Sequence, residues 1–205
     1  MKQVIPKALG YMVAMSALAA CSPSGAPPAL GSIAFPADEQ VTAALEAQFA
    51  SDRNSAAARD LVRTLGGDKG RLRYQIHQVI YRQGAYEARY DAVLVMGQPG
   101  AQSLQALYAS MIPEAERTKL PAGDLNAYEG WLKQQAESLK KTSAPQAQAL
   151  AGTLEMLGKC YRGKEAGAEV TVMQGLGALL SPERKGGLHA EKLALPDTTV
   201  QCLPA

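Results

Sequence analysis

The stretch RLRYQIHQVIYRQGAYEARYDAVLVM, residues 71–96, decides the fold. On both sides of Gly84 it alternates polar and apolar residues with the period of two that a β-strand requires. The pattern predicts an antiparallel β-hairpin. A three-residue loop, Gln83–Ala85, sorts the side chains onto two faces better than the two-residue loop Gln83–Gly84. In the three-residue register the apolar face consists of Leu72, Tyr74, Ile76, Ile80, Ala88, Tyr90, Ala92, Leu94 and Met96.

The same register gives the hairpin a polar face on which His77 lies opposite Asp91. We interpret the two as an exposed cross-strand pair, which contributes up to about 1 kcal/mol. A histidine that titrates near neutral pH beside the carboxylate is the alternative. The polar face consists of Arg73, Gln75, His77, Tyr81, Glu87, Arg89 and Asp91.

Helical patterns lie on both sides of the hairpin. Apolar residues recur there at the spacing of one helix face, and glycine or proline marks most of the ends. The two longest helices are joined by a short loop, so we expect them to pack as an antiparallel helix hairpin. In chain order the pattern predicts helices over residues 37–50, 55–65, 101–112, 114–120, 124–141 and 145–161.

The C-terminal part is predicted to be extended. Residues 169–173, 188–193 and 198–203 have the character of short strands, and residues 175–180 suggest a short helix before Pro182. The predicted fold class is therefore α+β. An N-terminal helix precedes the β-hairpin, a helical block follows it, and short strands end the chain.

The first 21 residues form a separate signal. A positively charged start precedes an apolar stretch of 13 residues, 8–20, and the stretch ends in Leu-Ala-Ala-Cys at 18–21. A spanning helix needs about 20 apolar residues, and small residues before the break are typical of a processing site. The last four residues resemble the lipobox of bacterial prolipoproteins. The resemblance implies that residues 1–20 are a signal peptide and that Cys21 becomes the lipidated N-terminus; a secretory peptide with a chance cysteine is the alternative.

Ser22 gives the expected address. In the lipoproteins that the lipobox resembles, an aspartate at this position favours retention at the inner membrane. Serine therefore implies the outer membrane, with the inner membrane less favoured and the domain facing the periplasm. Several acyl chains give stable anchoring where one gives marginal binding. The rest of the chain resembles proteobacterial lipoproteins of unassigned function only in general character, which implies no activity.

Residues 21–36 are expected to be the lipidated end and a proline-rich tether. Four of the 15 residues from Ser22 to Pro36 are proline. At about 3.1 Å per residue, such a segment reaches roughly 45 Å when extended. Residues 37–205 then have the length of one periplasmic domain.

The two cysteines left in the domain, Cys160 and Cys202, are expected to form one disulfide. An oxidising compartment favours pairing, and no C-x-x-C motif suggests a redox pair instead. The bond closes a loop of about 43 residues, worth roughly 4 kcal/mol in the chain-entropy model.

The charge balance excludes some partners. The net charge of +2 belongs to the signal peptide, because removal of Lys2 and Lys7 leaves 19 basic and 19 acidic residues. A neutral domain argues against a nucleic-acid partner and against an electrostatic grip on anionic lipid head groups. Contact with the membrane is expected through the lipid.

The sequence shows no pattern of catalytic or metal-binding residues. The two histidines, His77 and His189, lie far apart in the chain, and there is no G-x-S-x-G, H-E-x-x-H or G-x-G-x-x-G motif. A site built from carboxylates alone stays open. We therefore expect no enzymatic activity, no cofactor and no metal.

The best candidate for a partner-binding site is the tip of the hairpin. Tyr81, Arg82 and Tyr86 surround the turn, and tyrosine and arginine are frequent hot-spot residues; the strand propensity of tyrosine is the alternative explanation. We expect a lipid-anchored envelope protein that binds another envelope protein in an assembly, adaptor or scaffold role. An immunity or inhibitor lipoprotein against a periplasmic toxin or enzyme is the alternative, and a small-ligand carrier stays open.

Overall fold

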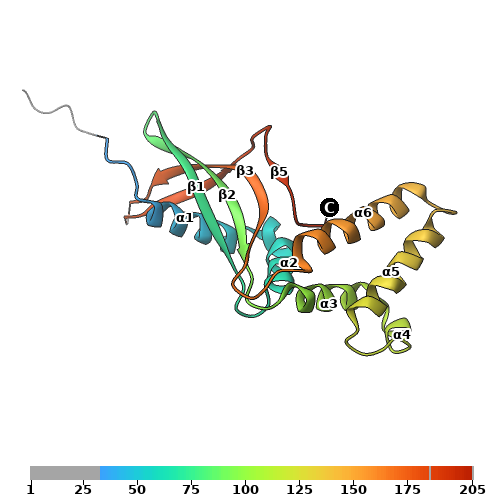
Figure 1. Ribbon diagram of the computed structural model, residues 1–205. Helices are drawn as coiled ribbons and strands as arrows, with labels where there is room; N and C mark the ends of the chain where they lie inside the picture. The colour runs from blue at the N-terminus through green and yellow to red at the C-terminus, as the bar shows by residue number, and fades with distance from the viewer. Residues whose placement is uncertain (1–32, 185, 205) are drawn as a thin grey trace, which may run out of the picture. The chain divides into compact units, whose positions relative to one another are not determined.

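The computed structural model describes residues 33–184 and 186–204, and these have the predicted α+β fold (Figure 1). Helices and strands follow one another nearly as the apolar patterns indicate. In chain order the elements are α1 (Asp38–Ser51), η1 (Arg53–Ser55), α2 (Ala56–Gly66), β1 (Arg71–Arg82), β2 (Ala85–Val95), α3 (Gly100–Met111), α4 (Glu114–Arg117), α5 (Leu125–Leu139), α6 (Ala144–Tyr161), β3 (Glu169–Pro182), β4 (Leu188–Leu193) and β5 (Thr199–Val200).

The strands form one antiparallel sheet in the order β1-β2-β3-β4, with β5 paired to β3. Helix α1 lies across one face of this sheet and contacts β4, β1 and β3 (Figure 1). Its Val41, Ala44 and Leu45 are buried there. On the sheet side the buried residues under the helices include Tyr74, Ala88, Tyr90, Ala92, Leu94, Ala178, Leu180 and Ala190.

The hairpin forms as predicted, but the predicted three-residue loop and its register are wrong. The loop is the two-residue Gln83–Gly84, because Arg82 pairs with Ala85. Both loop residues have positive φ, 48° and 95°, as a type I′ turn requires. The register then shifts at His77, where β1 carries a bulge between Ile76 and Gln78.

The bulge explains why sorting the side chains by face suggested the wrong loop. One extra residue in β1 reverses which face each later residue occupies. Toward the tip, Val79 and Tyr81 therefore share the face of Tyr74, and Ile80 lies on the other face, as the pairing shows. The separation of polar and apolar side chains that favoured a longer loop is therefore produced by the bulge within β1.

The carboxylate of Asp91 on β2 contacts both neighbouring strands, β1 and β3, at the places where their registers shift. Asp91 Oδ2 lies 2.9 Å from Nε2 of His77 on β1, and Asp91 Oδ1 accepts a 2.9 Å hydrogen bond from the backbone N–H of Gly175 on β3. Gly175 lies where the β2–β3 register also shifts. The predicted contact of His77 with Asp91 is thus confirmed, although Gln75 is the residue paired with Asp91.

The short helix predicted over 175–180 is wrong, because β3 continues without a break from Glu169 to Pro182. Leu176, Ala178 and Leu180 pair with Tyr90, Ala88 and Tyr86 at the period of two. A buried alternating run outweighs the weak helical pattern of so short a segment. The last predicted strand is real but covers only Thr199–Val200.

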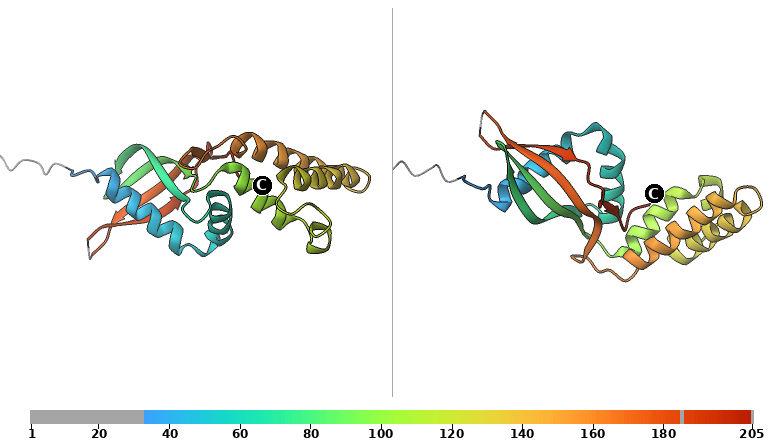
Figure 2. Two further views of the ribbon diagram at one scale, coloured as in Figure 1. Left: turned by 60° about the horizontal axis from the view of Figure 1, so that its bottom comes forward. Right: turned by 90° about the horizontal axis from the view of Figure 1, so that it is seen from above.

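The long helices pack as the predicted helix hairpin. Helices α5 and α6 lie side by side, and α3 packs against both (Figure 2). Tyr108, Leu157 and Tyr161 are completely buried between these elements. Trp131 on α5 is only partly buried, so the core of this block rests on its neighbours Tyr128 and Leu132.

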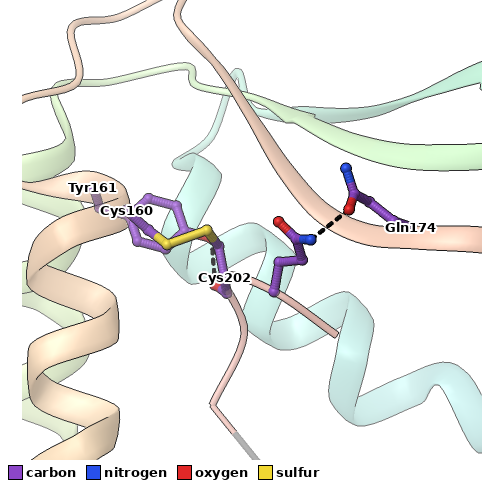
Figure 3. The surroundings of a disulfide bond; sticks show 5 residues. Cys160, Tyr161, Gln174 and Cys202 are labelled. Atoms are coloured by element: carbon purple, nitrogen blue, oxygen red, sulfur yellow. Dashed lines mark hydrogen bonds between the residues drawn. A yellow bond between two sulfur atoms is a disulfide. The ribbon is translucent and has the colours of Figure 1, made fainter. Parts of the chain in front are cut away.

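The predicted disulfide joins Cys160 at the end of α6 to Cys202 (Figure 3). Beside it, the hydroxyl of Tyr161 donates a 2.8 Å hydrogen bond to the backbone oxygen of Cys202. A further hydrogen bond joins the side chains of Gln201 and Gln174. The final segment, residues 194–203, is therefore fastened to both α6 and β3; we refer to it as the C-terminal strap.

Candidate functional site

A cavity of about 630 Å³ lies between the sheet and the segment α1–η1–α2. Its volume falls in the range of small-molecule sites. The sheet supplies one wall, the two helices supply the opposite wall, and the C-terminal strap closes one side. Most of the lining is apolar and includes Phe49, Val62, Leu72, Tyr74, Leu176 and Leu195.

The sequence creates this space by placing small residues where the walls approach. Ala58 on α2, Ala92 on β2 and Gly177 on β3 all line the cavity. At Gly177 the side chain of Leu195 reaches to 2.6 Å from where a Cβ would stand. The strap can therefore lie close over β3 while the centre of the site stays unfilled.

Two tyrosines form a neutral part of the sheet wall. The rings of Tyr74 and Tyr90 meet edge to face, with centroids 5.5 Å apart. Loss of solvent raises the pKa of Tyr90 to about 12 and that of Tyr74 further still. Both hydroxyls therefore stay uncharged at any physiological pH.

The charged side chain of the lining, Lys192, lies with Asn54 and Ser55 where η1 meets β4. The ammonium of Lys192 donates to a carboxylate oxygen of Asp52 and, at 2.9 Å, to the hydroxyl of Ser55. Asp52 also accepts from the hydroxyl of Ser55 at 2.9 Å and from the backbone N–H of Asn54 at 2.9 Å. Hydrogen bonds from Lys192, Ser55 and Asn54, in that order, lower the pKa of Asp52 to about 2.

The predicted tip residues lie together, with one addition that the sequence did not suggest. The tilted rings of Tyr81 and Tyr86 pack with centroids 5.5 Å apart, and the ring of Phe35 packs at a tilt against that of Tyr86 with centroids 5.8 Å apart. Phe35 and Tyr81 keep exposed fractions of 57% and 39%. Arg82 instead pairs with Glu87 through a 2.9 Å contact. We refer to Phe35, Tyr81 and Tyr86 as the aromatic cluster.

The remaining predictions concern Cys21, metal-binding residues, membrane-spanning helices and His189. Cys21 lies outside the described residues, so its lipidation stays a prediction. Within the described ranges, no three metal-ligating side chains come together, and no helix there is both long and apolar enough to cross a bilayer. His189 lies 3.9 Å from Glu183, far in sequence from the His77–Asp91 contact.

Comparison of the chain with protein-family models, with curated proteins and with solved structures finds no match.

Sequence reasoning missed the cavity because no single segment encodes it. Its lining comes from seven helices and strands and the strap. The usable signals were small: Ala92 among larger residues of β2, and Gly177 in an otherwise apolar run. Both are ordinary in a strand that is simply buried.

Proposed function

We propose that this protein is a non-catalytic binding protein of the cell envelope that holds the apolar part of a small molecule in the cavity. The observation that carries the proposal is the cavity itself, about 630 Å³ with mainly apolar walls and a polar group at one side. Natural pockets of that size and lining bury most of a small ligand and use few polar groups to orient it.

The test measures binding of the fluorescent probe N-phenyl-1-naphthylamine to the full-length protein. We expect saturable binding to the wild type. Ala58→Phe places a ring from α2 into the cavity and is expected to weaken binding about tenfold or more, close to 1.4 kcal/mol. Ala57→Phe is the matched control, since Ala57 is the exposed neighbour on the same helix and does not line the cavity.

Binding by the control with loss in Ala58→Phe, both variants being folded by circular dichroism, supports the proposal. An absence of saturable binding to the wild type, or equal binding by both variants, would contradict it.

The proposed location is the periplasmic side of the outer membrane, with a lipid on Cys21. The support for the anchor is the Leu-Ala-Ala-Cys sequence at 18–21. Cys21→Ala is expected to move the protein from the membrane fraction to the soluble fraction or to leave it unprocessed. Normal processing and membrane retention of that variant would exclude the anchor.

The aromatic cluster supports a second candidate function, capture of another envelope protein. Phe35 and Tyr81 are large and exposed, and exposed aromatic residues are enriched at interfaces. Replacing Tyr81 and Tyr86 by serine is expected to abolish cross-linking to a partner in intact cells. Unchanged cross-linking by the folded double variant would remove this candidate. The double variant is expected to bind N-phenyl-1-naphthylamine as the wild type does.

A further inference from the structure

Lys192 lies at the boundary between the cavity and water. It belongs to β4 and pairs with the buried Ala178 of β3, so it lies on the sheet face that the helices cover. Its side chain lines the cavity and is still 55% exposed. A lysine in this position keeps its stem along apolar surface and its charge toward solvent.

The ammonium group has hydrogen-bonding capacity left. It carries three donors, and its two hydrogen bonds go to Asp52 and Ser55. Beside it, Asn54 also lines the cavity. Across the residues that the structure describes, the side-chain amide of Asn54 takes part in no hydrogen bond. One ammonium donor and one amide therefore remain available to a ligand at this place.

The local charge favours an anion. Asp52 is the acidic group in contact with Lys192. Arg59 adds a second positive charge nearby, and its guanidinium donates to the backbone oxygens of Phe49 and Asp52, at 2.7 Å each, rather than to a carboxylate. Of these three charged groups only Lys192 lines the cavity, so the charge that a ligand meets at this side is positive.

The remainder of the cavity suits only an uncharged chain. Beyond Lys192 its lining contains no charged side chain, and Tyr74 and Tyr90 are neutral phenols. A charge placed in that interior would lose its hydration without gaining a partner. The head group and the tail of an amphiphile thus have separate places.

From this arrangement we infer that the cavity takes a single-chain amphiphile with an anionic head group, its tail among the apolar residues and its head on Lys192 and Asn54. The inference rests on the proposed function and names its ligand class. Hydrogen bonds to charged groups are stronger than neutral ones, so an anionic head is expected to bind about tenfold tighter than a neutral one on the same chain.

The experiment displaces N-phenyl-1-naphthylamine from the full-length protein at pH 8 with dodecanoate, dodecyl phosphate or 1-dodecanol. The three probes share one tail and differ in the head. For the wild type we expect at least one anion to displace the dye about tenfold better than the alcohol. In Lys192→Met, which keeps the aliphatic stem, this ratio is expected to fall to about one while displacement by the alcohol is unchanged.

Lys140→Met is the matched control, because it also removes a lysine from an ion pair, with Glu137 on the distant helix α5. It is expected to keep the wild-type ratio. Asp52→Asn is expected to increase the ratio, since it removes the competing anion and retains a side chain able to cap η1.

Equal displacement by all three probes in the wild type, or an unchanged ratio in Lys192→Met, would overturn the inference and leave the apolar cavity intact. No displacement by any of them, together with no dye binding, would instead refute the proposed function.

Discussion

Replacing Gly100 with alanine is expected to lower the free energy of unfolding by more than about 3 kcal/mol. Gly100 is the first residue of α3, and a Cβ there would stand 1.9 Å from the backbone oxygen of Tyr161. The backbone N–H of Gly100 also donates a 2.7 Å hydrogen bond to the oxygen of Lys164. Backbone atoms cannot move aside as a flexible side chain can, so the start of α3 and the end of α6 must separate.

Gly152→Ala is the matched control for this substitution. Gly152 lies inside α6, and a Cβ there would meet no atom within 4 Å. Alanine in an open helix interior is favoured over glycine by up to about 1 kcal/mol. Both variants replace glycine with alanine, but Gly100→Ala is expected to lower the free energy of unfolding and Gly152→Ala to raise it. Urea denaturation followed by circular dichroism measures both, and similar stability of the two variants would show that α3 and α6 do not meet at Gly100.

The elements were predictable where their pattern is long or their chemistry is restrictive. The helices around Leu132 and Leu157 follow from apolar residues repeated on one face, and both residues are buried. The Cys160–Cys202 bond followed from the cysteine count, because assigning Cys21 to lipid leaves only one possible pair.

The register of the hairpin was harder to predict from the sequence, because it depends on the length of the turn and on a bulge within β1 together. The bulge at His77 lets β1 combine a tight two-residue turn with one apolar face, and nothing local to His77 marks it as the extra residue. Asp91 reaches that bulge and Gly175 at once. A contact between residues 84 positions apart cannot be read from either neighbourhood.

The candidate sites also differ in how far the sequence could predict them. The aromatic cluster is partly local, since Tyr81 and Tyr86 pair across one turn, and they could be named in advance. Phe35 joins them only because α1 begins beside the hairpin tip, so the sequence assigned it to the tether. The cavity depends on the strap lying against β3, and this placement follows from the tertiary structure alone.

The second large effect is expected from the disulfide. In the double variant Cys160→Ser/Cys202→Ser, the free energy of unfolding is expected to fall by about 2–5 kcal/mol, because the bond spans 42 positions and restricts the unfolded chain. The strap keeps other attachments, among them the hydrogen bonds from the Tyr161 hydroxyl to the oxygen of Cys202 and from the Gln201 N–H to the oxygen of Val172 at 3.0 Å.

Because these attachments remain, the effect of removing the disulfide on the strap can be measured separately by hydrogen exchange. Without the bond, local opening of the strap becomes easier than global unfolding, so the amide of Gln201 is expected to exchange faster while that of Leu94, in the buried centre of the sheet, changes only with global stability. A reducing agent is expected to lower the stability of the wild type to that of the double variant and to leave the double variant unchanged. Equal protection of Gln201 in both proteins would mean that the strap is held without the disulfide. In that case, the closed side of the cavity would owe nothing to the bond, and the pairing of the strap with β3 together with Leu195 packed against Gly177 would hold it.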